Sequence, residues 1–231
     1  MLLFSILTAA VAPGISLLTY LYLKDRYESE PISMVIRMFV FGMLIVIPIV
    51  VIQRGLELWL GDNPVLFAFV QSAGIEELAK WFVLYHLIFN HTEFDEPYDG
   101  IVYAASISLG FATLENVMYA VFSPATFGTL LMRALLPVSG HALFGVAMGY
   151  YLGKAKFAPK RKVQRYLAIT LLLPMLLHGI YDYLMVSYSS NWMWTIIPFM
   201  AFLWVWGIRK MQRATSRSPF RYLASEEEIK L

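Results

Sequence analysis

The sequence contains no cysteine and few charged residues, and both shortages narrow the classes of protein to which it can belong. Without cysteine there can be no disulfide, no thiolate metal site and no cysteine nucleophile. Charged residues make up 15% of the 231 residues, whereas soluble domains average about a quarter. Hydrophobic residues make up 59%. This composition predicts a polytopic membrane protein.

Several motifs of familiar hydrolases are also missing. The chain has no Gly-x-Ser-x-Gly elbow, no His-Glu-x-x-His zinc motif and no Gly-x-Gly-Asp aspartyl motif. No internal repeat, low-complexity tract or soluble domain is visible either. We therefore expect one transmembrane domain over residues 1–231, with a basic tail from about residue 209.

Long apolar segments fill most of the chain. A helix needs roughly 20 apolar residues to cross a bilayer, and seven segments reach or approach that length. Short connections separate them, which predicts an all-α bundle of about seven transmembrane helices. The segments lie near residues 3–23, 32–53, 64–89, 100–122, 127–153, 166–187 and 192–208.

Lysine and arginine are concentrated in the connection 24–31, in the connection 154–165 and in the tail from residue 209. With seven crossings, these three stretches lie on the same side of the membrane. Because cytoplasmic loops are enriched in basic residues, we expect that side to be cytoplasmic. The N-terminus is then outside and the C-terminus inside.

The third apolar segment carries Glu76, Glu77 and Lys80 near its middle. Each charged group at a helix centre costs about 2.5–3.5 kcal/mol on insertion scales. Glu76 and Lys80 stand at i, i+4 and could form a purely structural ion pair. That pairing leaves Glu77, about 100° around the helix, unexplained. We therefore expect a functional polar site inside the membrane.

Three further segments carry ionisable or amide side chains at about 9–21 Å below their outer ends, at about 1.5 Å per residue. Polar groups that share one cavity cost less than polar groups that each face lipid. We therefore expect these side chains to converge on one site. They are Glu115 and Asn116 in the fourth segment, His141 in the fifth, and His178 and Asp182 in the sixth.

Each of these groups also has a structural interpretation. Glu115 and Asn116 could form a hydrogen-bonding clamp between helices. His141 follows a glycine and precedes an alanine, so it could be a hydrogen-bonded core residue. His178 and Asp182 stand at i, i+4, which suits a carboxylate that orients an imidazole.

Two chemical schemes fit this set of residues. In one, a carboxylate is the general base for a water molecule, and imidazoles or an asparagine stabilise the developing oxyanion. In the other, the side chains bind a metal such as zinc, which lowers the pKa of bound water towards about 7. Both schemes hydrolyse a bond inside the membrane. The metal ligands would be His141, His178, Glu76 and Glu115.

Four motifs on four successive helices resemble those of the PrsW family of bacterial intramembrane proteases, which are remotely similar to the CAAX prenyl endopeptidases. The resemblance extends from the second to the sixth segment and preserves motif order and spacing. The motifs are Glu76-Glu77 followed by Lys80, the segments from Gly110 to Asn116 and from His141 to Gly145, and His178 to Asp182.

The resemblance implies a multi-pass protein of the bacterial cell membrane. Its activity would be site-1 cleavage of a membrane-anchored anti-sigma factor on the extracytoplasmic side, which starts release of an envelope-stress sigma factor. The partners would be this single-pass substrate and the lipid bilayer, with no nucleic acid. The sequence does not fix the oligomeric state.

The resemblance also implies roles for individual residues, with one departure. The CAAX enzymes carry Arg after the double Glu and His in the second motif, where this chain has Lys80 and Glu115. The general base of the CAAX enzymes can therefore be assigned to a residue of this chain less directly than their fold can. The implied site has Glu76 and Glu77 as base candidates, Glu115 and His141 assisting, His178 and Asp182 completing it, and Lys80 and Asn116 supporting.

Two other classes of function compete with a protease. An ion- or proton-coupled transporter would also need buried Glu, His and Asp as a relay. Such transporters often show paired repeats with broken helices, and none is visible here. A non-catalytic subunit that presents a substrate is the third interpretation.

Overall fold

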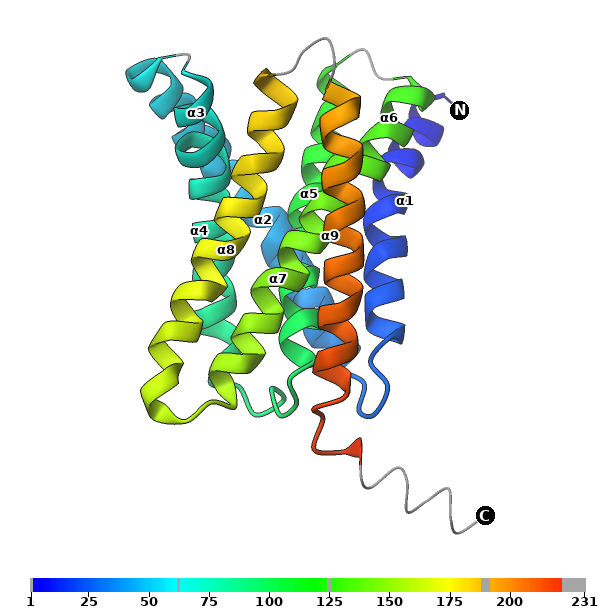
Figure 1. Ribbon diagram of the computed structural model, residues 1–231. Helices are drawn as coiled ribbons and strands as arrows, with labels where there is room; N and C mark the ends of the chain where they lie inside the picture. Colours follow the sequence, from blue (N-terminus) through cyan, green and yellow to red (C-terminus); the bar gives the residue numbers. More distant parts are fainter. Residues whose placement is uncertain (1, 62, 124–125, 188–191, 222–231) are drawn as a thin grey trace.

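The computed structural model describes residues 2–61, 63–123, 126–187 and 192–221, and all regular structure in these ranges is helical. This confirms the predicted all-α fold. Helices that follow one another run in alternating directions along one bundle (Figure 1). The elements are α1 (Leu2–Leu23), α2 (Ile32–Leu60), α3 (Pro64–Leu66), the π-helix η1 (Phe67–Ser72), α4 (Ala73–Ile88), α5 (Asp99–Phe122), α6 (Phe127–Arg133), the π-helix η2 (Ala134–Val138), α7 (Ser139–Lys156), α8 (Lys160–Ser187) and α9 (Trp192–Thr215).

Six helical stretches of the described chain are long and apolar enough to cross a membrane, namely α1, α2, α5, the run from α6 through η2 to α7, α8 and α9. The predicted third crossing consists of α3, η1 and α4, which continue one another from Pro64 to Ile88. Its charged residues make it less apolar than the other stretches. Figure 1 shows α4 standing beside α8 as part of the bundle.

The helices α5 and α7 form the centre of the bundle. Over an 18-residue apolar stretch of α5, 78% of the residues are buried. The corresponding share is 17% in α1 and 22% in α9. Close backbone contacts hold α5 in place: a Cβ on Gly110 would collide with the carbonyl of Phe39 in α2, and one on Gly149 in α7 would collide with that of Gly100. Small residues commonly allow such approach between membrane helices.

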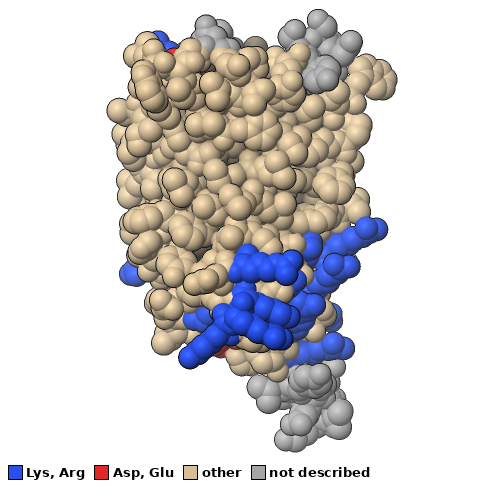
Figure 2. All heavy atoms as spheres, turned by 60° about the vertical axis from the view of Figure 1, so that its left-hand side comes forward, with Lys and Arg blue, Asp and Glu red and all other residues tan. Residues whose placement is uncertain are grey.

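The outer surface of the bundle is apolar along its length. Large side chains such as Ile47, Val51 and Leu172 are exposed there, as expected for helices that face lipid. Lysine and arginine gather at one end (Figure 2), where α7 ends and α8 begins. The first helix starts at the opposite end (Figure 1). The cytoplasmic position of the basic end stays a prediction, and residues 222–231 of the basic tail lie outside the described residues.

Candidate active site

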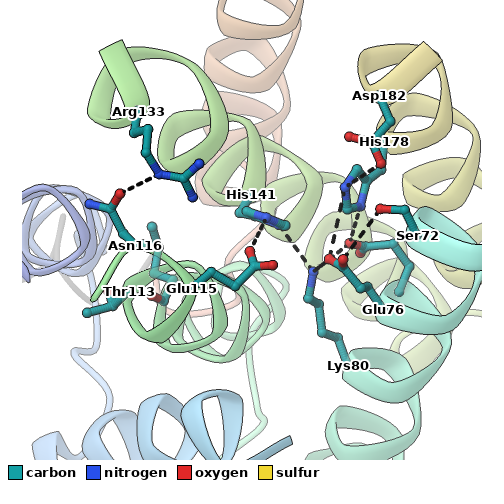
Figure 3. Close-up of polar contacts among 12 residues, drawn as sticks. Ser72, Glu76, Lys80, Thr113, Glu115, Asn116, Arg133, His141, His178 and Asp182 are labelled. Atoms are coloured by element: carbon teal, nitrogen blue, oxygen red, sulfur yellow. Dashed lines mark hydrogen bonds and ion pairs between the residues drawn. The ribbon is translucent and has the colours of Figure 1, made fainter. Parts of the chain in front are cut away.

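Four helices bring the predicted ionisable residues to one place inside the bundle (Figure 3). Two of these helices begin directly after a π-helical stretch, α4 after η1 and α7 after η2. A π-turn contains an extra residue and is common at functional sites. Glu76 and His141 each lie in the first turn after such a stretch, so the π-turns set the direction in which both side chains point.

Lys80 is the central cation of the site. Its Nζ donates to Glu77 Oε1 at 2.8 Å and to Glu76 Oε2 at 3.3 Å. The same nitrogen lies 3.1 Å from His141 Nδ1 and 4.1 Å from the centre of the Phe111 ring. The side chain is fully buried. The expected pair between Glu76 and Lys80 therefore exists, but it belongs to a larger network that includes Glu77.

His178 lies among three carboxylates, and its Nε2 is 4.0 Å from Glu76 Oε2. Its Nδ1 is 3.0 Å from Glu77 Oε1, and its Nε2 is 3.4 Å from Asp182 Oδ2. Because an ionised carboxylate only accepts hydrogen bonds, Nδ1 carries a hydrogen. The ring also stacks on Phe144, with centroids 4.8 Å apart. These contacts fix the orientation of the imidazole and direct Nε2 away from Glu77.

His141 connects the lysine to the fourth carboxylate. An ammonium only donates, so the Nδ1 that faces Lys80 is an acceptor and the hydrogen is on Nε2. Nε2 lies 3.1 Å from Glu115 Oε2, to which it can therefore donate. The Glu115 side chain is 29% exposed, whereas the side chains of Glu76 and Glu77 are 5% and 0% exposed.

Glu76 stands at the junction of two cavities, and Glu77 does not reach either of them. One cavity has a volume of about 240 Å³ and the other about 340 Å³. Both volumes exceed the roughly 30 Å³ that a water molecule occupies in the liquid. The smaller cavity is lined by Glu76, Glu115, His141, His178 and Asp182, together with Ser72, Arg133, Phe67, Pro137, Phe144, Tyr181, Met185 and Val186.

Three residues that the sequence did not single out as site residues border the cluster. Ser72 at the end of η1 donates to Glu76 Oε1 at 3.4 Å. Gln53 in α2 donates to Glu76 Oε1 at 3.0 Å. Arg133 at the end of α6 lines the smaller cavity. Gln53 ends the second apolar segment, and its amide is a weak signal that this end of the helix faces a polar neighbour.

Asn116 lies outside the cluster and joins three helices. Its Nδ2 donates to the Ala10 carbonyl in α1 at 2.8 Å, and its Oδ1 accepts from Arg133 Nε at 2.7 Å. This is the arrangement of an interhelical clamp. Asn116 touches the site only through Arg133.

The chain matches the family model described as PrsW family intramembrane metalloprotease over residues 30–207. The chain belongs to the PrsW family. It is 51% identical over 212 residues to Protease PrsW from Geobacillus kaustophilus, covering 91% of this chain and 92% of the relative. Protease PrsW from Bacillus subtilis is 48% identical over 214 residues, covering 92% of this chain and 97% of the relative. No solved structure matches the chain.

The similarity extends to more distant relatives, such as Protease PrsW from Clostridioides difficile, which is 31% identical over 221 residues and covers 90% of this chain and 91% of the relative. This PrsW-family protein is therefore a peptide hydrolase and a multi-pass protein of a bacterial membrane. Family membership confirms the predicted resemblance and favours the protease over the transporter.

The donor groups of the site suit a metal such as zinc in type and spacing, in keeping with the family description. One atom from each of Glu76, Glu77, His141 and His178 lies within 4.8 Å of the others, and carboxylates and imidazoles are common zinc ligands. The structure groups Glu77 with the other three, whereas Glu115 was the fourth ligand expected from the sequence. A bound metal would supply a water of lowered pKa. It would have to compete with the Lys80 ammonium for three of these groups.

Proposed function

We propose that this PrsW-family protein makes the first cut in a single-pass anti-sigma factor on the extracytoplasmic side of the membrane, which starts release of an envelope-stress sigma factor. The observation that carries this proposal is the position of Glu76 between two cavities. The smaller cavity is bordered by Met185 and Val186 in the last turn of α8. That turn lies at the end of the bundle away from the basic connection (Figure 1), which supports a cut in the outer half of the bilayer.

Glu76 is the general base of the proposed reaction. Gln53 binds its Oε1 and Lys80 binds its Oε2, so the carboxylate is held in one position. A carboxylate has about four lone-pair directions, which leaves room for a water molecule in the cavity. Glu76 removes a proton from this water and passes it to the leaving amine after the attack on the peptide carbonyl.

In its imidazolium form, which has a hydrogen on both ring nitrogens, His178 is the proposed donor to the oxyanion that forms during this attack. Glu77 holds Nδ1 from the buried side, and Nε2 lies on the side of the cavity near Asp182. A donor that is already oriented stabilises developing negative charge without rearrangement. Glu77 and Asp182 then act by positioning the imidazole, and Glu115 with His141 forms the opposite wall of the cavity.

The substrate would lie across the junction of the two cavities. They share Phe67, Ser72, Glu76 and Glu115, so a chain that occupies both must pass over the carboxylates. The larger cavity continues towards Gln53 and Arg54 near the end of α2. This arrangement suits an extended or unwound segment at the end of a transmembrane helix.

Cleavage of a single-span substrate by the purified protein in liposomes tests this proposal. We expect Glu76→Gln, Glu77→Gln, Glu115→Gln and His178→Ala each to abolish cleavage while the protein still inserts. His86→Ala is the matched control, because His86 is exposed on α4 and hydrogen-bonds to the Phe82 carbonyl of its own helix. Cleavage by all four variants would refute the site, and proton or ion flux without cleavage would support the transporter.

A further inference from the structure

A second cluster of carboxylates lies at the basic end of the bundle, far from the active site. It consists of Asp25 in the connection between α1 and α2, Glu96 in the connection before α5, and Asp99, the first residue of α5. One carboxylate oxygen from each lies within 4.8 Å of the others. Asp99 and Glu115 are 16 positions apart on α5, which corresponds to about 24 Å along the helix. The cluster is therefore separate from the proposed active site.

The carboxylates of this cluster are buried and have no cationic side-chain partner among the described residues. Asp25 is 7% exposed, and Glu96 and Asp99 are each 1% exposed. Among the residues that the structure describes, none of the three forms an ion pair with Lys, Arg or His. Buried charges are costly unless they are paired or coordinate a metal.

Several oxygens of the cluster are also without hydrogen-bond partners. Both oxygens of Asp25, Oε2 of Glu96 and Oδ1 of Asp99 are buried and unpartnered. The Asp25 carboxyl contacts the carboxyl of Glu96 and the backbone N–H of Arg26, so a cation bound between Asp25 and Glu96 would take the place of a proton that the two carboxyl groups share. The other oxygen of Asp99 accepts from the backbone N–H groups of Asp95 and Glu96 at 2.9 and 2.7 Å, which fixes the direction of Oδ1.

We propose that Asp25, Glu96 and Asp99 bind a hard divalent cation of the calcium type. Carboxylate oxygens are the ligands that calcium and magnesium prefer, and the cluster contains no imidazole or thiolate that would favour zinc. Calcium binds oxygens at about 2.3–2.6 Å. Two ligands on opposite sides of one calcium ion are thus about 4.6–5.2 Å apart, which accommodates the observed spacing.

An acidic cavity lies next to the cluster, because Glu30 in its wall contacts Asp99. A cavity of about 250 Å³ at the same end of the bundle is lined by Glu28, Glu30, Glu93 and Asp95, with Ser29 and Pro31. Carboxylates on its walls attract cations. Glu30 borders this cavity and also accepts a hydrogen bond from Tyr103 of α5, which links the cavity to the helix that begins at Asp99.

The cation would hold together segments that are distant in sequence. Asp25 follows α1, whereas Glu96 and Asp99 lie immediately before and at the start of the central helix α5. Figure 1 shows both connections at the same end of the bundle. Because α5 also carries Glu115, a cation that fixes its first turn stabilises the scaffold of the active site without touching the substrate.

Protons offer the alternative way to neutralise the cluster. Burial, aided by the neighbouring Glu96, raises the pKa of Asp25 to about 9. A cluster that held only protons would make the protein less stable as the pH rises towards 9, and no cation would change its stability specifically. The proton-bound and the cation-bound cluster therefore differ in how the stability of the protein responds to pH and to an added cation.

Thermal unfolding and equilibrium dialysis of the full chain in detergent test the proposal. After removal of divalent ions, we expect added calcium to raise Tm at constant ionic strength and to bind at one ion per chain. Asp25→Asn and Glu96→Gln should each weaken this binding at least about tenfold. Glu57→Gln is the control, because it removes an exposed carboxylate at the opposite end of α2.

Terbium emission provides a second readout that needs no variant. Tyr98 and Tyr103 belong to the same region as the cluster, so excitation of tyrosine should sensitise a terbium ion bound there, and calcium should displace it. Glu76→Gln should leave both the calcium shift and the terbium signal unchanged, which separates this site from the protease site. Absence of a calcium-specific Tm shift and of stoichiometric binding at millimolar calcium would overturn the proposal, as would unchanged binding by Asp25→Asn.

Discussion

His178 Nδ1 lies 3.0 Å from Glu77 Oε1, in a position where the two side chains are 5% and 0% exposed. Their contact joins α8 to α4 and fixes the face of the imidazole that is directed to the cavity. Glu77 does not line the cavities, whereas Glu76 lines both. Two adjacent carboxylates thus have different surroundings, and we propose that Glu76 is the general base and that Glu77 positions His178.

Substitution of the two glutamates should separate catalysis from folding. We expect Glu76→Gln to lower kcat by about 10²–10⁴, the usual contribution of a general base, with little change in unfolding. Glu77→Gln should lower kcat and also stability, because it alters a fully buried partner of Lys80 and His178. Single-turnover cleavage and denaturant unfolding in mixed micelles measure both effects. Equal effects of the two variants on stability would contradict this division.

Removal of the lysine should be more damaging than removal of either glutamate. In Lys80→Met, two buried carboxylates lose their cation, and breaking a buried ion pair typically costs about 3–5 kcal/mol. We expect this loss in the free energy of unfolding, accompanied by loss of cleavage. Lys80→Arg should not restore activity, since the guanidinium is planar and larger and Phe111 lies only 4.1 Å from Nζ. A stable, active Lys80→Met variant would show that the network is dispensable.

Asn116 should be a stability residue rather than a catalytic one. Asn116→Leu removes the bonds to the Ala10 carbonyl and to Arg133. Interhelical hydrogen bonds in membranes contribute about 0.6 kcal/mol on average and up to about 1.7, so we expect destabilisation in that range. Cleavage should persist with a kcat near that of the unaltered protein. A loss of cleavage as large as that of Glu76→Gln would place Asn116 in the reaction itself.

The sequence predicted which side chains form the site better than it predicted the contacts between those side chains. Glu76 with Lys80 and His178 with Asp182 could be paired in advance, because residues at i, i+4 share a helix face. The contact of Gln53 with Glu76 joins two helices, and nothing in a single sequence shows which faces of separate helices meet. For the same reason, the sequence could not show that Glu77, and not Glu115, lies in the tightest group of potential metal ligands.

The ends of the helices were also predicted less well than their existence. The second and last segments were expected to end near residues 53 and 208, but α2 continues to Leu60 and α9 to Thr215. The sixth was expected from residue 166, yet α8 begins at Lys160. Apolar runs mark the part of a helix inside the bilayer, whereas the hydrogen-bonded helix continues into the polar interface. Of the seven expected crossings, six correspond to described helical stretches that are long and apolar enough to span a membrane.

The role of a metal can be tested without disturbing the proposed calcium site. We expect cleavage to continue in a zinc-selective chelator with excess calcium present, because the Lys80 ammonium already binds three of the four donor groups. Calcium must be kept in excess, since a general chelator would also strip the cluster around Asp25. Loss of cleavage in this chelator, with recovery on addition of zinc, would show that a metal displaces the ammonium in the active enzyme.

The position of the cut in a single-span substrate tests the central claim most directly. Mass spectrometry of the fragments from liposomes of known orientation locates the scissile bond relative to the basic end of the protein. We expect the scissile bond in the half of the bilayer away from that end, and no cut by Glu76→Gln. A bond on the same side as the basic end, or an unchanged cut by Glu76→Gln, would contradict it.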